Sequence, residues 1–90
     1  MAVTVYVPTM YRGLAVGEAR VRAVGRDLAE VVADLEAGHP GFRERICEGA
    51  EIRPYVNVYV NGGEVRGLQG MWTPVRDGDE VVIFPVVAGE

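Results

Sequence analysis

The residues most able to take part in chemistry lie at the C-terminus, where a short apolar tail continues past the last predicted strand. The tail reads Val86-Val87-Ala88-Gly89-Glu90. Small and β-branched residues favour an extended backbone, and a glycine near the end lets the backbone pass close to another protein's surface because it has no Cβ. We therefore expect the chain end to be received by a partner, as a substrate in itself.

The rest of the chain offers few reactive groups. Its single cysteine, Cys47, excludes an intramolecular disulfide and a cluster held by four cysteines, and it is typical of a reducing cytoplasm. No histidine or acid constellation accompanies it. The single histidine, His39, lies before Pro40 in a helix-ending turn, where an exposed histidine without a chemical role is expected. We predict no catalytic residue, no metal site and no bound cofactor in this chain.

The spacing of apolar residues predicts the strands and the helix of the first half of the chain, which belong to the domain that carries this tail. Ninety residues make one domain. Alternation predicts a strand over residues 2–8 and a second strand near 19–24, which together form a hairpin. Asp27 is placed to begin a helix that ends at Gly38, because apolar residues recur between them at helical spacing. These residues are Leu28, Val31, Val32 and Leu35.

In the second half of the chain, a short helical turn and a loop are expected over 41–54. The clearest strand follows at 55–61, and a glycine-rich turn leads from it into a short strand at 64–66. An irregular segment at 67–76 precedes the last strand, at 79–85. The apolar residues of that segment, which should pack against the sheet edge, are Leu68, Met71 and Trp72.

This order of elements, ββαβββ, places a single helix against the one apolar face of a mixed sheet. We predict an α+β fold of the ubiquitin-like β-grasp type, with a sheet of four to five strands and one main helix packed on one face. The β-grasp domain spans residues 1–85, and a flexible C-terminal tail spans residues 86–90.

The outer face of the sheet is the predicted docking surface. If Val81 and Ile83 point inward, alternation turns Val82 and Phe84 outward beside the tail. By the same rule the rings of Tyr6 and Tyr59 lie outward, and an exposed aromatic surface next to a reactive tail is a plausible docking patch. These rings could equally cover the sheet or contact a second copy of the chain; Phe84 is the strongest candidate.

The charge pattern limits the classes of partner. All nine basic residues are arginines, thirteen acidic residues outnumber them, and the net charge is −4. A nucleic-acid binder normally shows the reverse balance, and no apolar run reaches the roughly 18–20 residues that span a membrane. The absence of lysine means that the chain cannot accept a lysine isopeptide bond. Arg66 and Arg76 flank the docking side and could meet an acidic partner, although charge does not decide this.

Taken together, these features resemble the ubiquitin-like bacterial sulfur-carrier family. That family includes the small subunit of molybdopterin synthase and the carriers of the thiamine and cysteine pathways. The resemblance covers the whole chain, and its most specific segments are Tyr59-Val60-Asn61, Asp77-Gly78-Asp79-Glu80-Val81 and Phe84-Pro85-Val86-Val87-Ala88-Gly89. The chain is most similar to the cysteine-pathway carrier, through Val3-Thr4-Val5, Val7-Pro8-Thr9, Asp34-Leu35-Glu36-Ala37, Glu44-Arg45 and Val56-Asn57-Val58-Tyr59-Val60-Asn61.

The resemblance implies a protein co-substrate and not an enzyme. A ubiquitin-activating-type enzyme would use ATP to adenylate the terminal glycine, here Gly89, and would convert it to a thiocarboxylate. Val86, Val87 and Ala88 would thread the tail into that enzyme. The implied sulfur acceptor is a pyridoxal-phosphate-dependent cysteine synthase, and a metalloprotease could process the tail or release the product.

The final residue departs from the family pattern, because such tails end in Gly-Gly and this one ends in Gly89-Glu90. Glu90 would bring bulk and a second carboxylate toward a site built around ATP phosphates. Three explanations are open: Glu90 is removed, it is an alteration that blocks the tail, or the chain is a non-carrier relative. The alternatives to a carrier are a ubiquitin-like interaction module and a subunit of molybdopterin synthase.

Overall fold

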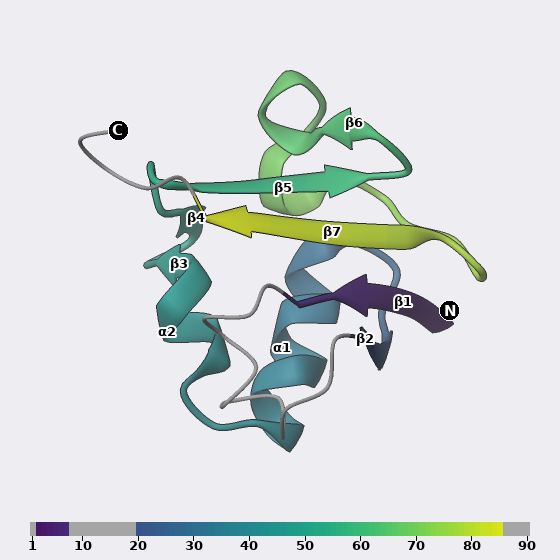
Figure 1. Cartoon of the computed structure of the whole chain (residues 1–90), viewed down its shortest axis with the longest axis horizontal. Helices are drawn as coiled ribbons and strands as arrows, with labels where there is room; N and C mark the ends of the chain where they lie inside the picture. Colours follow the sequence, from purple (N-terminus) through teal and green to yellow (C-terminus); the bar gives the residue numbers. More distant parts are fainter. Residues whose placement is uncertain (1, 8–19, 86–90) are drawn as a thin grey trace.

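The chain forms one mixed sheet with its main helix packed across one face (Figure 1). The computed structural model describes residues 2–7 and 20–85. The strands of the main sheet are β1 (Ala2–Tyr6), β2 (Arg20–Val24), β5 (Val56–Val60), β6 (Gly63–Glu64) and β7 (Glu80–Pro85). The other elements are α1 (Leu28–Gly38), α2 (Phe42–Ile46), β3 (Cys47–Glu48), β4 (Glu51–Ile52) and the 3-10 turns η2 (Val65–Gly67) and η3 (Gly70–Trp72).

The strand order in the main sheet is β2-β1-β7-β5-β6, so the last strand lies at its centre. β1 and β7 run parallel, whereas β2 pairs antiparallel with β1 and β5 pairs antiparallel with β7. The predicted α+β β-grasp fold, with a five-stranded sheet and one main helix, is confirmed.

The core lies between the sheet and the helices and follows the predicted alternation. Every second residue of each central strand points inward. The apolar residues that recur at helical spacing on α1 pack against these inward side chains. The buried side chains of the sheet are Val3, Val5, Val7, Val56, Val58, Val60, Val81 and Ile83. Those of α1 and α2 are Leu28, Val31, Val32, Leu35, Phe42 and Ile46. Because all of these face one side, the opposite face of the sheet is open.

The start of α1 is fixed by reciprocal capping, as the position of Asp27 predicted. The Asp27 carboxylate accepts a hydrogen bond from the backbone N–H of Glu30 at 2.9 Å, and the Glu30 carboxylate accepts one from the backbone N–H of Arg26 at 2.8 Å. The first bond satisfies a donor that the helix N-terminus otherwise leaves unpaired, and the second ties the residue before the cap to the first turn. The helix ends at Gly38, as predicted.

Two predictions for the second half of the chain need correction. The loop expected after α2 contains a two-stranded hairpin, β3 with β4, which was not predicted because two-residue strands are too short to show alternation. The strand expected at 64–66 is only Gly63–Glu64, and the next three residues form η2. The turn before it is as expected, since Asn61 and Gly62 both have positive φ, at 50° and 88°.

The prediction that Trp72 packs against the sheet edge is wrong, whereas Leu68 does lie against Gly63 of the edge strand β6 while remaining partly exposed. Trp72 is 67% exposed and Leu68 is 53% exposed, whereas Met71 is buried as expected. The segment from Met71 to Val75 alternates, with Met71, Thr73 and Val75 buried, so Trp72 is necessarily turned outward. Trp72 borders a depression of about 400 Å³ beside Ile52.

Candidate docking face

Four residues predicted to bind a partner lie together on the open face of the sheet. We call Tyr6, Tyr59, Val82 and Phe84 the outer patch. The strand register places Tyr6 beside Val82 and Val82 beside Tyr59, so three of them form a row across β1, β7 and β5. Phe84 continues along β7 toward the tail and is 53% exposed. The alternation used in the sequence therefore predicted their placement correctly.

Contacts between side chains hold the rings of the outer patch. The rings of Tyr59 and Phe84 meet edge to face, with centroids 5.7 Å apart and planes at 81°, a geometry that adds about 0.5–1.5 kcal/mol beyond burial. The Tyr6 hydroxyl donates a hydrogen bond to the Glu80 carboxylate at 3.2 Å. Tyr6, Tyr59 and Val82 are half-buried by this packing, which leaves Phe84 as the most prominent ring.

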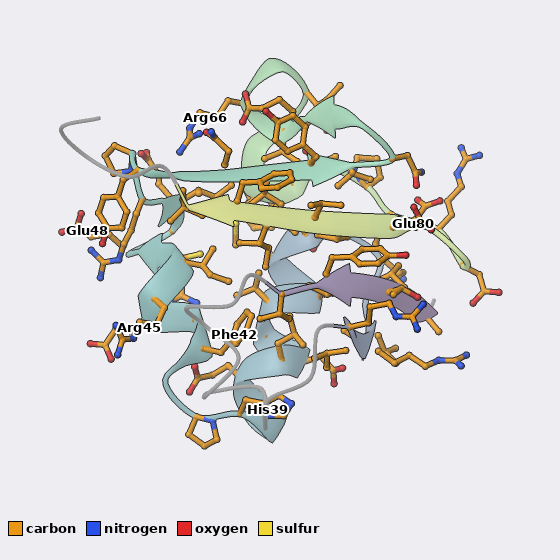
Figure 2. All side chains as sticks on the ribbon, in the orientation of Figure 1. His39, Phe42, Arg45, Glu48, Arg66 and Glu80 are labelled. Atoms are coloured by element: carbon orange, nitrogen blue, oxygen red, sulfur yellow. The ribbon has the colours of Figure 1, made fainter. Side chains whose placement is uncertain are left out.

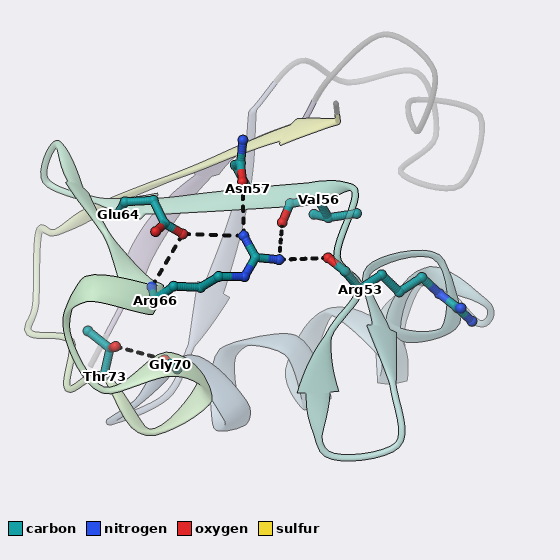
Figure 3. A network of polar contacts seen from close by, with 7 residues as sticks. All are labelled: Arg53, Val56, Asn57, Glu64, Arg66, Gly70 and Thr73. Atoms are coloured by element: carbon teal, nitrogen blue, oxygen red, sulfur yellow. Dashed lines mark hydrogen bonds and ion pairs between the residues drawn. The ribbon is translucent and has the colours of Figure 1, made fainter. Parts of the chain in front are cut away.

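Arg66 braces the start of β5 (Figure 3). Its Nη2 donates to the backbone carbonyls of Arg53 and Val56, both at 2.7 Å, and its Nη1 donates to the Asn57 side-chain oxygen at 2.9 Å. Asn57 is the register partner of Phe84 on the neighbouring strand. Arg66 therefore fixes the start of β5 next to the end of β7, where the tail begins.

This network changes the interpretation of Arg66 as a residue that could meet an acidic partner. Its guanidinium already satisfies two carbonyls and an amide oxygen, and it also approaches the Glu64 carboxylate at 3.5 Å. The sequence contains a signal for this role that was missed. The hairpin pairs Tyr59 with Glu64, and extending that register by two residues brings Arg66 opposite Asn57.

We expect Arg66→Met to lower the free energy of unfolding by about 1.5–3 kcal/mol, because hydrogen bonds from a charged donor are lost and two carbonyls lose their partners. Arg66→Lys should recover only part of this, since an ammonium group does not reproduce the planar fork. Urea denaturation measures both. The control is Arg45→Met, on the exposed side of α2 (Figure 2), which should change stability by less than about 0.5 kcal/mol. Equal losses at positions 66 and 45 would contradict the bracing role.

Cys47 and His39 lie away from the outer patch. Cys47 is 2% exposed, its Sγ lies 3.9 Å from the Met71 sulfur, and burial raises the pKa of its thiol although two arginines stand nearby. A buried thiol with a raised pKa is a poor nucleophile. His39 is half-buried and not exposed as expected, and its backbone N–H closes α1 by donating to the Leu35 carbonyl at 2.8 Å.

The tail residues predicted to react or to thread, Val86, Val87, Ala88, Gly89 and Glu90, lie outside the described residues. The last described pair in the sheet is Pro85 with Val56, so β7 delivers the chain to the same end of the sheet as Phe84. Among residues 2–7 and 20–85, no group of three or more His, Cys, Asp or Glu side chains could hold a metal ion. In the same part of the chain, no helix has the length and hydropathy needed to cross a membrane.

The mixed sheet with one main helix packed across one face defines a ubiquitin-like β-grasp protein. The chain belongs to the ThiS family, whose model matches residues 5–89.

Named relatives agree with this assignment. The chain is 41% identical over 92 residues to the sulfur carrier protein CysO of Mycobacterium tuberculosis, covering 99% of each chain. It is 47% identical over 62 residues to small archaeal modifier protein 3 of Haloferax volcanii, covering 69% of this chain and 67% of that protein. These names are those of carriers and modifiers, in agreement with the prediction that the chain is not an enzyme.

Solved structures agree as well. The Amycolatopsis orientalis BexX/CysO complex contains a chain that matches with a TM-score of 0.94 and 39% identity, covering 98% of this chain and 99% of that one. M. tuberculosis CysO matches with a TM-score of 0.89 and 40% identity, covering 94% and 99%. The resemblance to the cysteine-pathway carrier that the sequence indicated is confirmed.

Proposed function

We propose that this chain carries sulfur as a thiocarboxylate on Gly89 and donates it for cysteine biosynthesis. The observation that supports this most is the outer patch, in which Tyr6, Tyr59, Val82 and Phe84 form one continuous surface at the end of the sheet from which the tail departs. A partner seated on this surface is positioned to receive the chain end.

The chemistry takes place in the partner and uses the tail as substrate. A carboxylate oxygen attacks the α-phosphorus of ATP, pyrophosphate leaves, and an acyl adenylate forms. Hydrosulfide then attacks the carbonyl carbon, AMP leaves with the carboxylate oxygen that had attacked phosphorus, and loss of the sulfur-bound proton to solvent leaves a thiocarboxylate. The carrier supplies no acid or base for these steps. Its own contribution is to dock and to present the extended tail, which reduces the conformational entropy lost on binding.

The proposed partners follow from the relatives. The first is a ubiquitin-activating-type enzyme that uses ATP, which this chain does not itself bind. The second is a sulfur acceptor, and the similarity to CysO favours a pyridoxal-phosphate-dependent cysteine synthase. The existence of a BexX/CysO complex supports docking of such carriers onto a partner protein. A single buried cysteine suits a reducing cytoplasm, where we place the reaction.

Glu90 must be removed before this chemistry can begin. Residues 77–89 keep the sequence of the turn, the last strand and the apolar tail, and only the last residue departs from a glycine end. A metalloprotease is the proposed processing enzyme, and its cleavage would expose the Gly89 carboxylate.

The test is to incubate the chain ending at Gly89 with the native host's activating enzyme, ATP and sulfide, and to measure its intact mass. We expect a gain that corresponds to one oxygen replaced by sulfur. An unchanged mass, with an enzyme that is active on a known carrier, would exclude the carrier function.

A second candidate function is protein modification, favoured by the identity to small archaeal modifier protein 3. The activated Gly89 would then be transferred to an amine of another protein, and the absence of lysine would restrict this chain to the donor role. A permanent subunit of molybdopterin synthase is a weaker candidate, since the Pyrococcus furiosus putative molybdopterin converting factor subunit 1 is 26% identical, with a TM-score of 0.74. Mass analysis of host proteins for conjugates of this chain separates modification from sulfur transfer.

A further inference from the structure

Two arginines without partners stand at one side of the outer patch. Arg20 and Arg22 are exposed on β2, the edge strand of the sheet, and alternate with the inward-facing Val21 and Ala23. Neither side chain forms a hydrogen bond or ion pair in the described part of the chain. This contrasts with Arg66 and Arg53, whose guanidinium groups bind backbone carbonyls.

The strand register joins this arginine pair to the outer patch. Arg20 is the partner of Tyr6, which is beside Val82 and then Tyr59, and Tyr59 pairs with Glu64 at the far edge. One row of neighbouring residues therefore crosses the five strands, in the order arginine, tyrosine, valine, tyrosine and glutamate. Arg22 belongs to the next row, beside Thr4, whose other neighbour is Glu80.

The negative groups in these rows are already engaged, and the positive groups are not. Glu64 faces Arg66 at 3.5 Å, and Glu80 accepts a hydrogen bond from the Tyr6 hydroxyl. Among the described residues, no carboxylate pairs with the two arginines on the β2 side of the apolar centre, and the Glu80 carboxylate keeps its own charge because the Tyr6 hydroxyl is neutral. This holds although the chain as a whole carries a net charge of −4.

The arginine pair lies within reach of any partner seated on the outer patch. Neighbouring strands are about 4.8 Å apart, so β2 lies roughly 10 Å from β7. One side of a standard interface covers about 800 Å², equivalent to a disc with a radius of roughly 16 Å. An interface centred on Val82 therefore covers Arg20 and Arg22 at its rim.

We propose that the protein that docks on the outer patch carries carboxylate side chains opposite Arg20 and Arg22. This inference rests on the proposed function, because it takes the outer patch as the docking site. An acidic strip on the partner would attract the arginine edge and orient the carrier. A partner without acidic side chains at this position would gain no electrostatic attraction from Arg20 and Arg22. The two arginines therefore select among partners as well as orienting the bound one.

Rim charges of this kind act mainly on the rate of association and are screened by salt. We expect Arg20→Glu and Arg22→Glu each to slow association with the native host's activating enzyme about tenfold at low ionic strength. At about 1 M salt the rates of the variants and the wild type should converge. Arg20→Lys and Arg22→Lys, which keep the charge, should associate at nearly the wild-type rate.

The matched control is Arg45→Glu, which makes the same change in net charge on α2, in the helical layer of the molecule (Figure 2). It should slow association no more than about twofold, an effect of net charge alone. Circular dichroism checks that each variant is folded, and Arg20→Gln and Arg22→Gln serve where a charge reversal disturbs the edge strand. Equal rates for the β2 reversals and Arg45→Glu would overturn the inference.

Phe84→Ala, measured in the same series, separates this inference from the proposed docking site. If Phe84→Ala weakens binding while the β2 reversals behave like Arg45→Glu, the outer patch stands and the acidic strip is wrong. If Phe84→Ala binds as the wild type does, the docking site itself is wrong and the inference falls with it.

Discussion

Deletion of Glu90 is expected to raise the rate at which the activating enzyme adenylates this chain by at least about 100-fold. The enzyme must place a single carboxylate against the α-phosphorus of ATP, and a displacement of about 1 Å at a reacting centre can change a rate by that factor. Glu90 moves the terminal carboxylate one residue further along the chain and adds a second negative charge near the phosphates. Release of pyrophosphate from ATP measures the rate.

Two variants of the last residue separate the causes of this effect. Glu90→Gly keeps the original length and removes the side chain, so it should be activated like the chain ending at Gly89 if the bulk and charge of Glu90 block activation, and like the wild type if the position of the terminal carboxylate does. Glu90→Gln removes the side-chain charge but keeps its bulk, so any gain over the wild type measures electrostatic repulsion. Rapid adenylation of the unaltered chain would show that Glu90 is compatible with activation and that no trimming is needed.

Phe84→Ala is expected to weaken binding to the activating enzyme by about 10- to 100-fold, or roughly 1.4–2.8 kcal/mol. Phe84 is 53% exposed and lies on β7 just before the tail. Within the outer patch its ring makes an edge-to-face contact with the ring of Tyr59. Exposed aromatic residues at the centre of an interface are the ones that contribute most on truncation. Isothermal titration calorimetry measures the change.

Trp72→Ala is the matched control for Phe84→Ala. Trp72 is more exposed, at 67%, but it borders Ile52 and the β3–β4 hairpin and takes no part in the outer patch. Truncation of Trp72 should change the affinity for the activating enzyme by no more than about twofold, which corresponds to about 0.4 kcal/mol of binding free energy. Comparable losses for the two variants, or a larger loss for Trp72→Ala, would move the docking site to the Trp72 side of the molecule.

Much of the fold follows directly from the period of the apolar residues. The valines at 56, 58 and 60 alternate without interruption, and the same pattern at Val81 and Ile83 fixes which face of β7 is buried. Since a shift of one residue would reverse every side chain, the placement of Tyr59, Val82 and Phe84 on the outer face was determined as soon as these strands were identified. The start of α1 was equally predictable from the side chain of Asp27.

The sequence did not reveal features that depend on contacts between distant segments. β3 and β4 are two residues each and owe their pairing to the turn between them, where Gly49 has a φ of 64°. Trp72 was expected to pack inward because tryptophan usually does, but the buried neighbours Met71 and Thr73 leave it facing solvent. Arg66 was assigned to the surface because its carbonyl partners belong to the backbone and carry no sequence signal; only its third partner, Asn57, could have been inferred, from the register of the hairpin.

The contrast among the arginines has a functional consequence. The same residue type braces the start of β5 at position 66, whereas at positions 20 and 22 it has no hydrogen-bond or ion-pair partner among residues 2–7 and 20–85. Composition does not distinguish these roles, but strand register and hydrogen bonding do. The proposed docking face therefore combines an aromatic centre with the arginine edge that we infer contacts a partner.

The most direct test of the carrier function is the intact mass of this protein isolated from its native host. We expect the isolated chain to end at Gly89. A fraction of it should be heavier by the mass difference between sulfur and the oxygen that sulfur replaces. That fraction should return to the carboxylate mass after hydrolysis or after sulfur is transferred to the acceptor enzyme. A chain that always retains Glu90, with no thiocarboxylate form under any growth condition, would contradict the account.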